Sequence, residues 1–92
     1  MIVVTNKLSI KAIAELIGTT YRNVYYAIMI KGTIYEKYFT EIPKPIFVEE
    51  RYKYYDGEAV EKFRQFFKMN KMQERIFKSF IEQYKGKNLK YV

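Results

Sequence analysis

The chain has 92 residues, the length of one domain and near the size at which a single hydrophobic core suffices. It carries 17 Lys and Arg against 10 Asp and Glu, a formal net charge of +7, and 49% of its residues are hydrophobic, which excludes wholesale disorder. Because it contains neither Cys nor His, the composition excludes disulfide frameworks, zinc fingers and any catalysis that needs a thiolate or an imidazole.

No segment of the sequence predicts secretion or insertion into a membrane. The apolar run at residues 1–4 is too short for the hydrophobic part of a signal peptide, and no later apolar stretch approaches eighteen residues. We therefore expect a cytoplasmic protein without a membrane partner.

The basic excess lies mainly in the C-terminal third. Residues 1–56 hold eight basic and six acidic residues, whereas residues 57–92 hold nine and four, and eight of the ten Tyr precede residue 57. A basic, Tyr-rich chain favours a nucleic-acid partner, because Lys and Arg neutralise phosphates and Tyr rings stack or hydrogen-bond. AT-rich genomes also enrich Lys, Ile, Asn and Tyr whatever the function, so composition alone leaves both explanations open.

The first predicted helix begins after Ser9, a residue type that favours the N-cap position, and Gly18 supplies its end. Between them, apolar residues recur at i, i+3, i+4 and i+7, the spacing of one buried helical face. These residues are Ile10, Ile13, Ala14 and Ile17.

A second helix is predicted over residues 20–29, with Thr19 or Thr20 as its N-cap and Lys31-Gly32 as the signal for its end. Its predicted buried face consists of Val24, Ala27 and Ile28. The side chains that fall largely off this face are Arg22, Tyr25, Tyr26 and Met29.

The middle of the chain carries weaker signals. Residues 33–42 are ambiguous between a short helix and an irregular connection, and the Pro43-Lys44-Pro45 unit then forbids helix and favours an extended segment. Alternation of residue types over 46–48 and 51–55 indicates two short strands, joined by a hairpin turn near Glu49-Glu50.

Asp56-Gly57-Glu58 predicts the start of another helix, because acidic residues favour the positive end of the helix dipole. An apolar stripe follows as far as Lys85-Gly86, and only Asn70 interrupts it, so the stretch forms either one long helix or two. The stripe either completes the core or pairs with a second copy of the chain in a homo-oligomer. In both cases the basic residues expected on the outside are Lys62, Arg64, Lys68, Lys71, Arg75 and Lys78.

Two short helices around a tight turn at Gly18 fit a helix-turn-helix. Ala14 supplies the small residue that faces the partner helix, and Val24 supplies the buried β-branched residue of the second helix. Any two amphipathic helices joined by Gly would show the same triplet, so this pattern alone does not establish DNA binding.

The run over residues 8–25 resembles the opening of winged helix-turn-helix proteins of the MerR and excisionase group. Downstream, residues 42–46 and 51–63 look like the wing and the third helix of the AlpA-like branch of that group. The chain departs from the pattern in two places: residues 30–41 are longer than the usual connection, and Tyr54-Tyr55 stands where such proteins often have Trp.

The resemblance covers residues 8–67 and implies a mainly α fold, a winged helix-turn-helix with a two-stranded β-hairpin wing and an additional C-terminal helix. In this group the recognition helix enters the major groove, the wing touches the backbone or the minor groove, and members act as excisionases or transcription regulators of mobile elements. We expect a single domain over residues 1–92, with the helix-turn-helix at 8–30, the wing at 43–55 and a C-terminal helical part at 56–86.

The expected DNA contacts lie at the start and outer face of the second helix and on the hairpin. Arg22 can pair bidentately with guanine and Asn23 with adenine, although Arg22 can equally serve as a phosphate contact or a solvated charge. At least one of Tyr25 and Tyr26 is expected to pack against residues 35–39 instead. The full set is Thr20, Tyr21, Arg22, Asn23, Tyr25, Tyr26, Lys44, Arg51 and Lys53.

On the second strand, Arg51 and Lys53 alternate with Tyr52 and Tyr54, so that one face packs and the other presents cations to the DNA backbone. The two glutamates at the predicted turn oppose deep insertion of the hairpin tip, since carboxylates repel phosphates.

The sequence thus predicts a sequence-selective double-stranded DNA-binding protein without catalysis, cofactor or metal ion. The resemblance implies a transcription regulator, or an excisionase or architectural factor, of a phage or other mobile element. Two other partners stay open: a host or phage protein bound through a Tyr-rich surface, and a single nucleic-acid strand stacked on Tyr rings.

Overall fold

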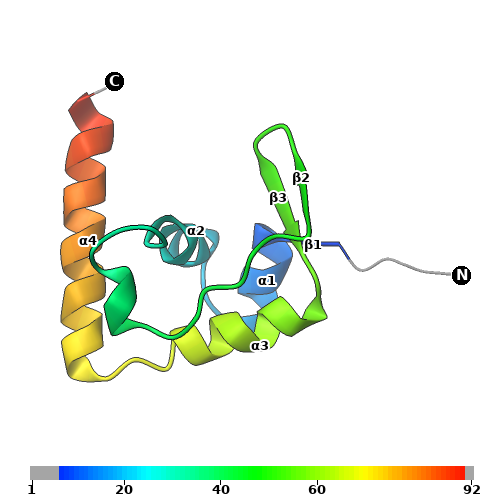
Figure 1. The fold of residues 1–92 in the computed structure, drawn as a ribbon, viewed down its shortest axis with the longest axis horizontal. Helices are drawn as coiled ribbons and strands as arrows, with labels where there is room; N and C mark the ends of the chain where they lie inside the picture. Colours follow the sequence, from blue (N-terminus) through cyan, green and yellow to red (C-terminus); the bar gives the residue numbers. More distant parts are fainter. Residues whose placement is uncertain (1–6, 91–92) are drawn as a thin grey trace, which may run out of the picture.

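The computed structural model describes residues 7–90, with side chains described as far as Lys85. Within this range the chain is mainly helical, as predicted, and carries a small antiparallel sheet (Figure 1). The elements in order are β1 (Leu8–Ser9), α1 (Ile10–Ile17), α2 (Tyr21–Met29), the 3₁₀ turn η1 (Glu36–Tyr38), β2 (Phe47–Glu49), β3 (Tyr52–Tyr55), α3 (Gly57–Phe66) and α4 (Lys71–Lys90).

The first two helices begin and end where their local signals predict. Ser9 caps α1, because its Oγ accepts a hydrogen bond from the Ala12 N–H at 3.1 Å. Gly18 ends α1 in the left-handed conformation, with φ +80°, and the N–H groups of Gly18 and Thr19 close the last turn on α1 carbonyls. Thr20 then caps α2, whose regular part ends at Met29, just before the predicted stop at Lys31-Gly32.

The sheet has three strands in the order β1-β3-β2, all antiparallel, where the sequence predicts only a two-stranded hairpin. β1 is two residues long, too short to show an alternating pattern, so no sequence signal identifies it. The hairpin turn also differs from the prediction. Glu49 pairs with Tyr52, which places the turn at Glu50-Arg51 rather than at Glu49-Glu50, and Glu50 has a positive φ of 56°.

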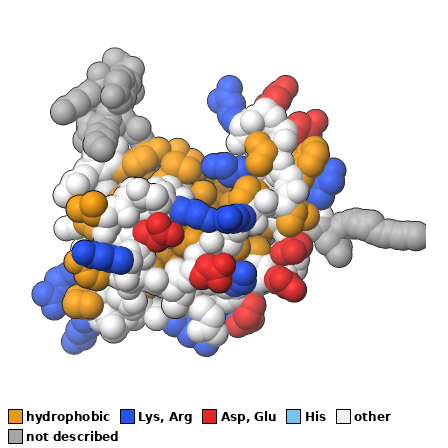
Figure 2. All heavy atoms as spheres, viewed as in Figure 1, with side chains coloured by type: hydrophobic (Ala, Val, Ile, Leu, Met, Phe, Trp, Pro, Cys, Tyr) orange, Lys and Arg blue, Asp and Glu red, His pale blue; other side chains and the backbone are white. Residues whose placement is uncertain are grey.

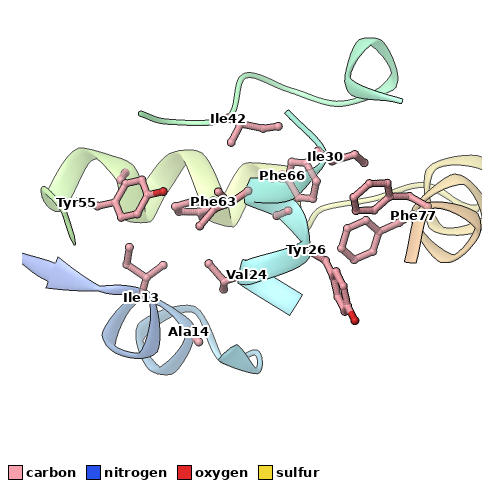
Figure 3. Close-up of a cluster of buried hydrophobic side chains, with 14 residues drawn as sticks. Ile13, Ala14, Val24, Tyr26, Ile30, Ile42, Tyr55, Phe63, Phe66 and Phe77 are labelled. Atoms are coloured by element: carbon pink, nitrogen blue, oxygen red, sulfur yellow. The ribbon is translucent and has the colours of Figure 1, made fainter. Parts of the chain in front are cut away.

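One hydrophobic core joins the elements. Figure 3 shows side chains from α1, α2, α3, β3 and α4 pointing into a common interior. Its largest fully buried side chains are Tyr55, Phe63, Phe66, Ile13, Ile30 and Val24. The apolar stripe of the C-terminal part contributes Phe77 and Phe80, both buried, so this part of the stripe completes the core of the single chain.

The C-terminal part forms two helices rather than one. α3 ends at Phe66, and α4 begins at Lys71 after a short link. Asn70 and Gln73 fix this start by a reciprocal pair of bonds: Asn70 Oδ1 accepts from the Gln73 N–H at 2.8 Å, and Gln73 Oε1 accepts from the Asn70 N–H at 3.0 Å. The Asn70 interruption in the stripe is therefore the cap of α4.

The connection between α2 and β2 is irregular apart from the single turn η1. Thr33 and Glu36 hold its first part locally, and Gln73 Nε2 of α4 donates to the Tyr38 carbonyl at 2.7 Å. The chain then runs back past α2 to the hairpin, which projects from one end of the molecule while α4 stands along the other (Figure 1).

No helix within the described part of the chain combines the length and the apolar character that crossing a membrane requires.

Candidate nucleic-acid interface

The first turn of α2 presents the most accessible of the predicted contact residues. Tyr21 is 54% exposed, and its ring stacks on that of Tyr25, with centroids 6.4 Å apart and planes 10° from parallel. Arg22 is exposed and forms no hydrogen bond or ion pair with any residue that the structure describes. Its guanidinium is therefore free to contact a partner.

Thr20 and Asn23 are engaged in hydrogen bonds at the N-terminal end of α2. Thr20 Oγ1 accepts from the Asn23 N–H at 3.1 Å, and Asn23 Nδ2 donates to Thr19 Oγ1 at 2.9 Å. Asn23 is half-buried. The Asn23 amide would have to leave Thr19 before it could pair with an adenine. The geometry therefore assigns Thr20 and Asn23 to the capping of α2.

Helix α4 covers part of the outer face of α2. The hydroxyl groups of Tyr25 and Tyr84 lie 3.0 Å apart in a hydrogen bond, and Tyr84 also meets the Tyr26 ring edge-on at 5.7 Å. Phe80 meets the same Tyr26 ring at 6.4 Å. The hydrogen bond with Tyr84, which favours the protonated hydroxyl, and, after it, burial raise the pKa of Tyr25 to about 12.

Tyr26 is therefore a core residue, contrary to its predicted place among the exposed contact residues. It is only 7% exposed, because Phe80 and Tyr84 of α4 enclose the ring that the α2 pattern places off the buried face. As expected, one of Tyr25 and Tyr26 packs in the interior. The expected partner segment, residues 35–39, is wrong, because the described rings outside α2 that contact Tyr26 are those of Phe80 and Tyr84 in α4. Tyr35 packs on Phe80 instead.

The hairpin presents its residues differently from the prediction. Lys53 lies on the same side of β3 as the fully buried Tyr55, whereas Tyr52 and Tyr54 face the other way, and Tyr52 is 60% exposed. Arg51 lies in the turn and is exposed. The predicted separation into a packed Tyr face and a cationic face is therefore wrong, because the residue that anchors β3 in the core is Tyr55.

The other side of the hairpin is partly apolar. Phe47 packs on Tyr54 with ring centroids 5.9 Å apart, and Lys7 Nζ lies 4.2 Å from the Phe47 ring centroid. At the tip, Glu49 and Glu50 accompany Arg51, and Figure 2 shows acidic and basic groups together there. A tip of this composition does not favour entry into a phosphate-lined groove.

Two predicted cations, Lys44 and Lys53, meet in one cleft of about 530 Å³ between the end of α2, the Pro43–Pro45 segment and β3. Lys31 joins them there, a residue whose only predicted role is to mark the end of α2. No local pattern could have found this grouping, because it depends on the path by which the irregular connection returns to α2. Apart from the three lysines, the cleft is lined by Ile28, Met29, Ile42, Pro43, Pro45 and Tyr55.

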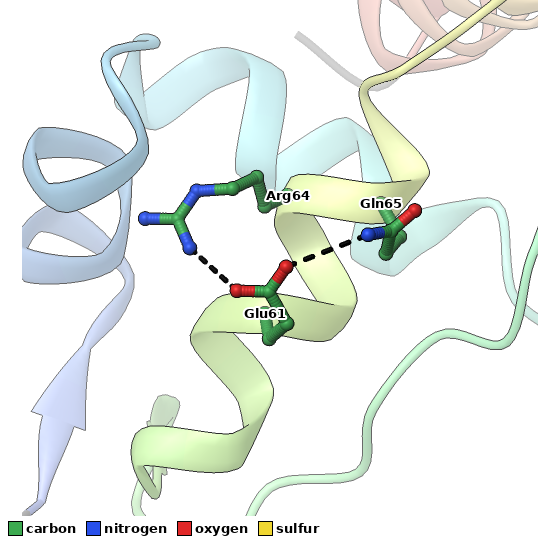
Figure 4. Close-up of polar contacts among 3 residues, drawn as sticks. All are labelled: Glu61, Arg64 and Gln65. Atoms are coloured by element: carbon green, nitrogen blue, oxygen red, sulfur yellow. Dashed lines mark hydrogen bonds and ion pairs between the residues drawn. The ribbon is translucent and has the colours of Figure 1, made fainter.

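Of the basic residues expected on the outside of the C-terminal part, two are paired. Arg64 Nη1 lies 2.7 Å from Glu61 Oε1, and Gln65 donates to the other oxygen of the same carboxylate (Figure 4). Lys62 Nζ lies 3.6 Å from Glu41 Oε2. The exposed residues that form no ion pair with a described residue are Lys68, Lys71, Arg75 and Lys78.

Within the described residues, no three acidic side chains gather in a way that could hold a metal ion.

The geometry brings Tyr21, Arg22 and Tyr25 together on α2 and places Lys44 and Lys53 apart from them, in the cleft at the far end of the same helix. Comparisons with protein-family models, with curated proteins and with solved structures gave no match.

Proposed function

We propose that the protein binds double-stranded DNA with sequence selectivity and without catalysis. In this proposal α1 and α2 act as a helix-turn-helix, the first half of α2 reads bases in the major groove, and the β2–β3 hairpin acts as a wing that touches one backbone strand. The observation that carries the proposal is Arg22, exposed and without a partner among the described residues, beside the exposed Tyr21 in the first turn of α2, which follows the left-handed turn at Gly18.

The site differs in two ways from the set that the sequence predicts. Base reading rests on Tyr21, Arg22 and the exposed part of Tyr25, because Tyr26 is buried and Asn23 is bonded to Thr19. The hairpin contributes Arg51 at its tip, next to Glu50, which limits it to a backbone contact.

The biological role rests on the resemblance of residues 8–67 to the MerR and excisionase group. It suggests a transcription regulator or an excisionase or architectural factor of a phage or other mobile element. A single small module has a limited contact area, roughly 600–1,000 Å², so cooperative binding to repeated sites or a homo-oligomer fits this role.

The alternative, a module that captures a host or phage protein through a Tyr-rich surface, has less support. Tyr25, Tyr26 and Tyr84 pack on one another, and Tyr35 packs on Phe80. These rings contribute to the interior instead of forming one exposed aromatic surface.

Selection of bound duplexes from a random pool, followed by affinity measurements over a range of salt, tests the proposal. We expect one enriched motif and an affinity that falls steeply with salt, since each displaced phosphate counterion contributes a slope of about −0.9 in log–log form. Arg22→Ala should reduce the preference at one base pair of the motif by about 1–3 kcal/mol.

Arg75→Ala is the matched control, because it removes an exposed arginine from α4 instead of α2. It should leave the preferred motif unchanged. Absence of any enriched motif, or binding that is insensitive to salt, would contradict the proposal. If Arg22→Ala lowered the affinity equally for every sequence, Arg22 would be a phosphate contact and not a base contact.

A further inference from the structure

We propose that the cleft lined by Lys31, Lys44 and Lys53 binds an acidic segment of a partner protein, with carboxylates at the three lysines and one apolar side chain on the cleft floor. We call this the lysine cleft. It is a second binding site, independent of the DNA contacts proposed for the first turn of α2.

The lysine cleft is assembled from three separate parts of the chain. Lys31 follows the end of α2, Lys44 lies between two prolines, and Lys53 lies on β3. The volume of about 530 Å³ falls within the range of protein sites that take up a side chain or a small ligand. In Figure 2, basic side chains lie across an apolar surface near the middle of the face shown, with acidic side chains beside them.

The lining of the lysine cleft carries three positive charges. No acidic residue lines it, and none of its lysines forms an ion pair with a described residue. Two glutamates of the same connection have other partners: Glu36 accepts a hydrogen bond from the Gly32 N–H at 3.0 Å, and Glu41 pairs with Lys62. Three cations around a concave surface, without an ion-pair partner among the described residues, favour an anionic ligand.

The floor indicates which kind of anion fits. It consists of aliphatic side chains and prolines, with the buried ring of Tyr55, so it offers an apolar surface but no exposed aromatic ring on which a base could stack. A phosphate backbone uses cations and leaves an apolar floor unused. A peptide that combines Asp or Glu with Leu or a similar residue uses both.

The position of the lysine cleft also separates it from the proposed DNA contacts. Arg22 lies in the first turn of α2, and Lys31 lies beyond its last turn, so the length of a nine-residue helix, about 13 Å, lies between them. A partner in the lysine cleft would therefore leave the first turn of α2 accessible.

The test is an NMR titration of the isotope-labelled full chain at low salt with three capped hexapeptides. The first has three carboxylates around one leucine, the second has the corresponding amides, and the third has serine in place of leucine. We expect amide shifts at the residues that line the cleft with the first peptide, and binding at least about tenfold weaker with each of the others.

Two triple variants with the same change in net charge complete the experiment. K31Q/K44Q/K53Q should weaken binding of the first peptide at least about tenfold, whereas K68Q/K71Q/K78Q, which alters cations outside the cleft, should change it less than about twofold. Equal weakening by both variants, or no shifts at the cleft, would overturn the proposal. So would a DNA duplex that shifts the same residues and displaces the peptide, because the cleft would then be a backbone contact.

Discussion

Tyr55 is the largest fully buried side chain of the structure, and it is also polar. Its ring packs edge-on against Phe63 at 5.4 Å, and its hydroxyl is buried without a hydrogen-bond partner among the described residues. A buried hydroxyl that loses water without gaining a partner costs about 1–3 kcal/mol. Tyr55 therefore anchors β3 through its ring and lowers the stability of the fold through its oxygen.

Tyr55→Phe removes the hydroxyl and keeps the ring. We expect the free energy of unfolding, measured in urea at neutral pH, to rise by about 1 kcal/mol. The matched control is Tyr54→Phe, the same change at the neighbouring half-buried tyrosine, which should alter stability by less than about 0.5 kcal/mol. A clear loss of stability in Tyr55→Phe would instead mean that the hydroxyl has a partner such as a bound water.

The burial and contacts of individual side chains were only partly predictable from the sequence. The cap role of Ser9 follows from its type and position and is confirmed, and of the two candidates for the cap of α2, Thr19 and Thr20, the structure selects Thr20. The burial of Tyr26 depends on Phe80, more than fifty positions away, and no local pattern carries that information. The same holds for Lys53, which takes its side of β3 from the anchoring of Tyr55.

At the scale of elements, the turn between α1 and α2 depends on one backbone conformation. Gly18 has φ +80°, and a Cβ placed there would meet no atom within 4 Å, so a larger residue would fit but would be strained. The Gly18 and Thr19 N–H groups bond to the carbonyls of Glu15 and Ala14 at 3.3 and 2.9 Å, which fixes the direction in which the chain enters α2.

Gly18→Ala should lower the free energy of unfolding by about 1 kcal/mol, measured by denaturant titration, because alanine is strained in the left-handed conformation. Gly57→Ala is the matched control, since Gly57 begins α3 without a positive φ and a Cβ there also meets open space. It should be neutral or stabilising by up to about 1 kcal/mol. Equal effects of the two substitutions would show that the turn does not require glycine.

Elements with a local signal were predicted from the sequence, including the two strands of the hairpin, whereas β1 and the path of the connection before the hairpin were not. Helices α1 and α2 follow from their caps and their 3.6-residue period, and Asn70 marks the break before α4 once its bonds with Gln73 are known. β1 exists because two residues pair with β3, and the path of residues 33–46 follows no period. Both depend on contacts between distant parts of the chain.

At the scale of the whole molecule, α4 and the hairpin lie at opposite ends and the core runs between them (Figure 1). Among the described residues, two tyrosines have raised pKa values and lie at different places along this core: Tyr55 on β3, and Tyr25 at the contact between α2 and α4. Their ionisation therefore reports on both parts of the interior at once.

Stability should fall as the pH rises from about 10 to about 12. Burial raises the pKa of Tyr55 to about 12, and the Tyr84 hydrogen bond with burial raises the pKa of Tyr25 to about 12, whereas the unfolded chain titrates near 10. Both hydroxyls therefore stay protonated to a higher pH in the folded state than in the unfolded chain. Their contribution to the free energy of unfolding is complete below pH 10 and is lost toward pH 12. Tyr55 alone accounts for roughly 2–3 kcal/mol of this loss.

Tyrosinate absorbance measures the pKa values of the tyrosines, and denaturant titration at each pH measures the free energy of unfolding. Tyr84→Phe should lower the pKa of Tyr25 without moving that of Tyr55, because it removes the first cause of the Tyr25 shift only. If all tyrosines of the native protein titrate together near pH 10, the described packing of both residues is wrong.

The hairpin tip has a consequence for how the molecule approaches a charged surface. Glu49, Glu50 and Arg51 give this projecting end a net charge of −1 on a chain of net charge +7, and Glu50 keeps a left-handed backbone that glycine or asparagine would adopt at lower cost. Separated charge of this kind is an electric dipole. Near a polyanion such as DNA the molecule would experience a torque that turns the basic remainder toward the charged surface first, so a backbone contact by Arg51 at the tip would form only after that initial encounter.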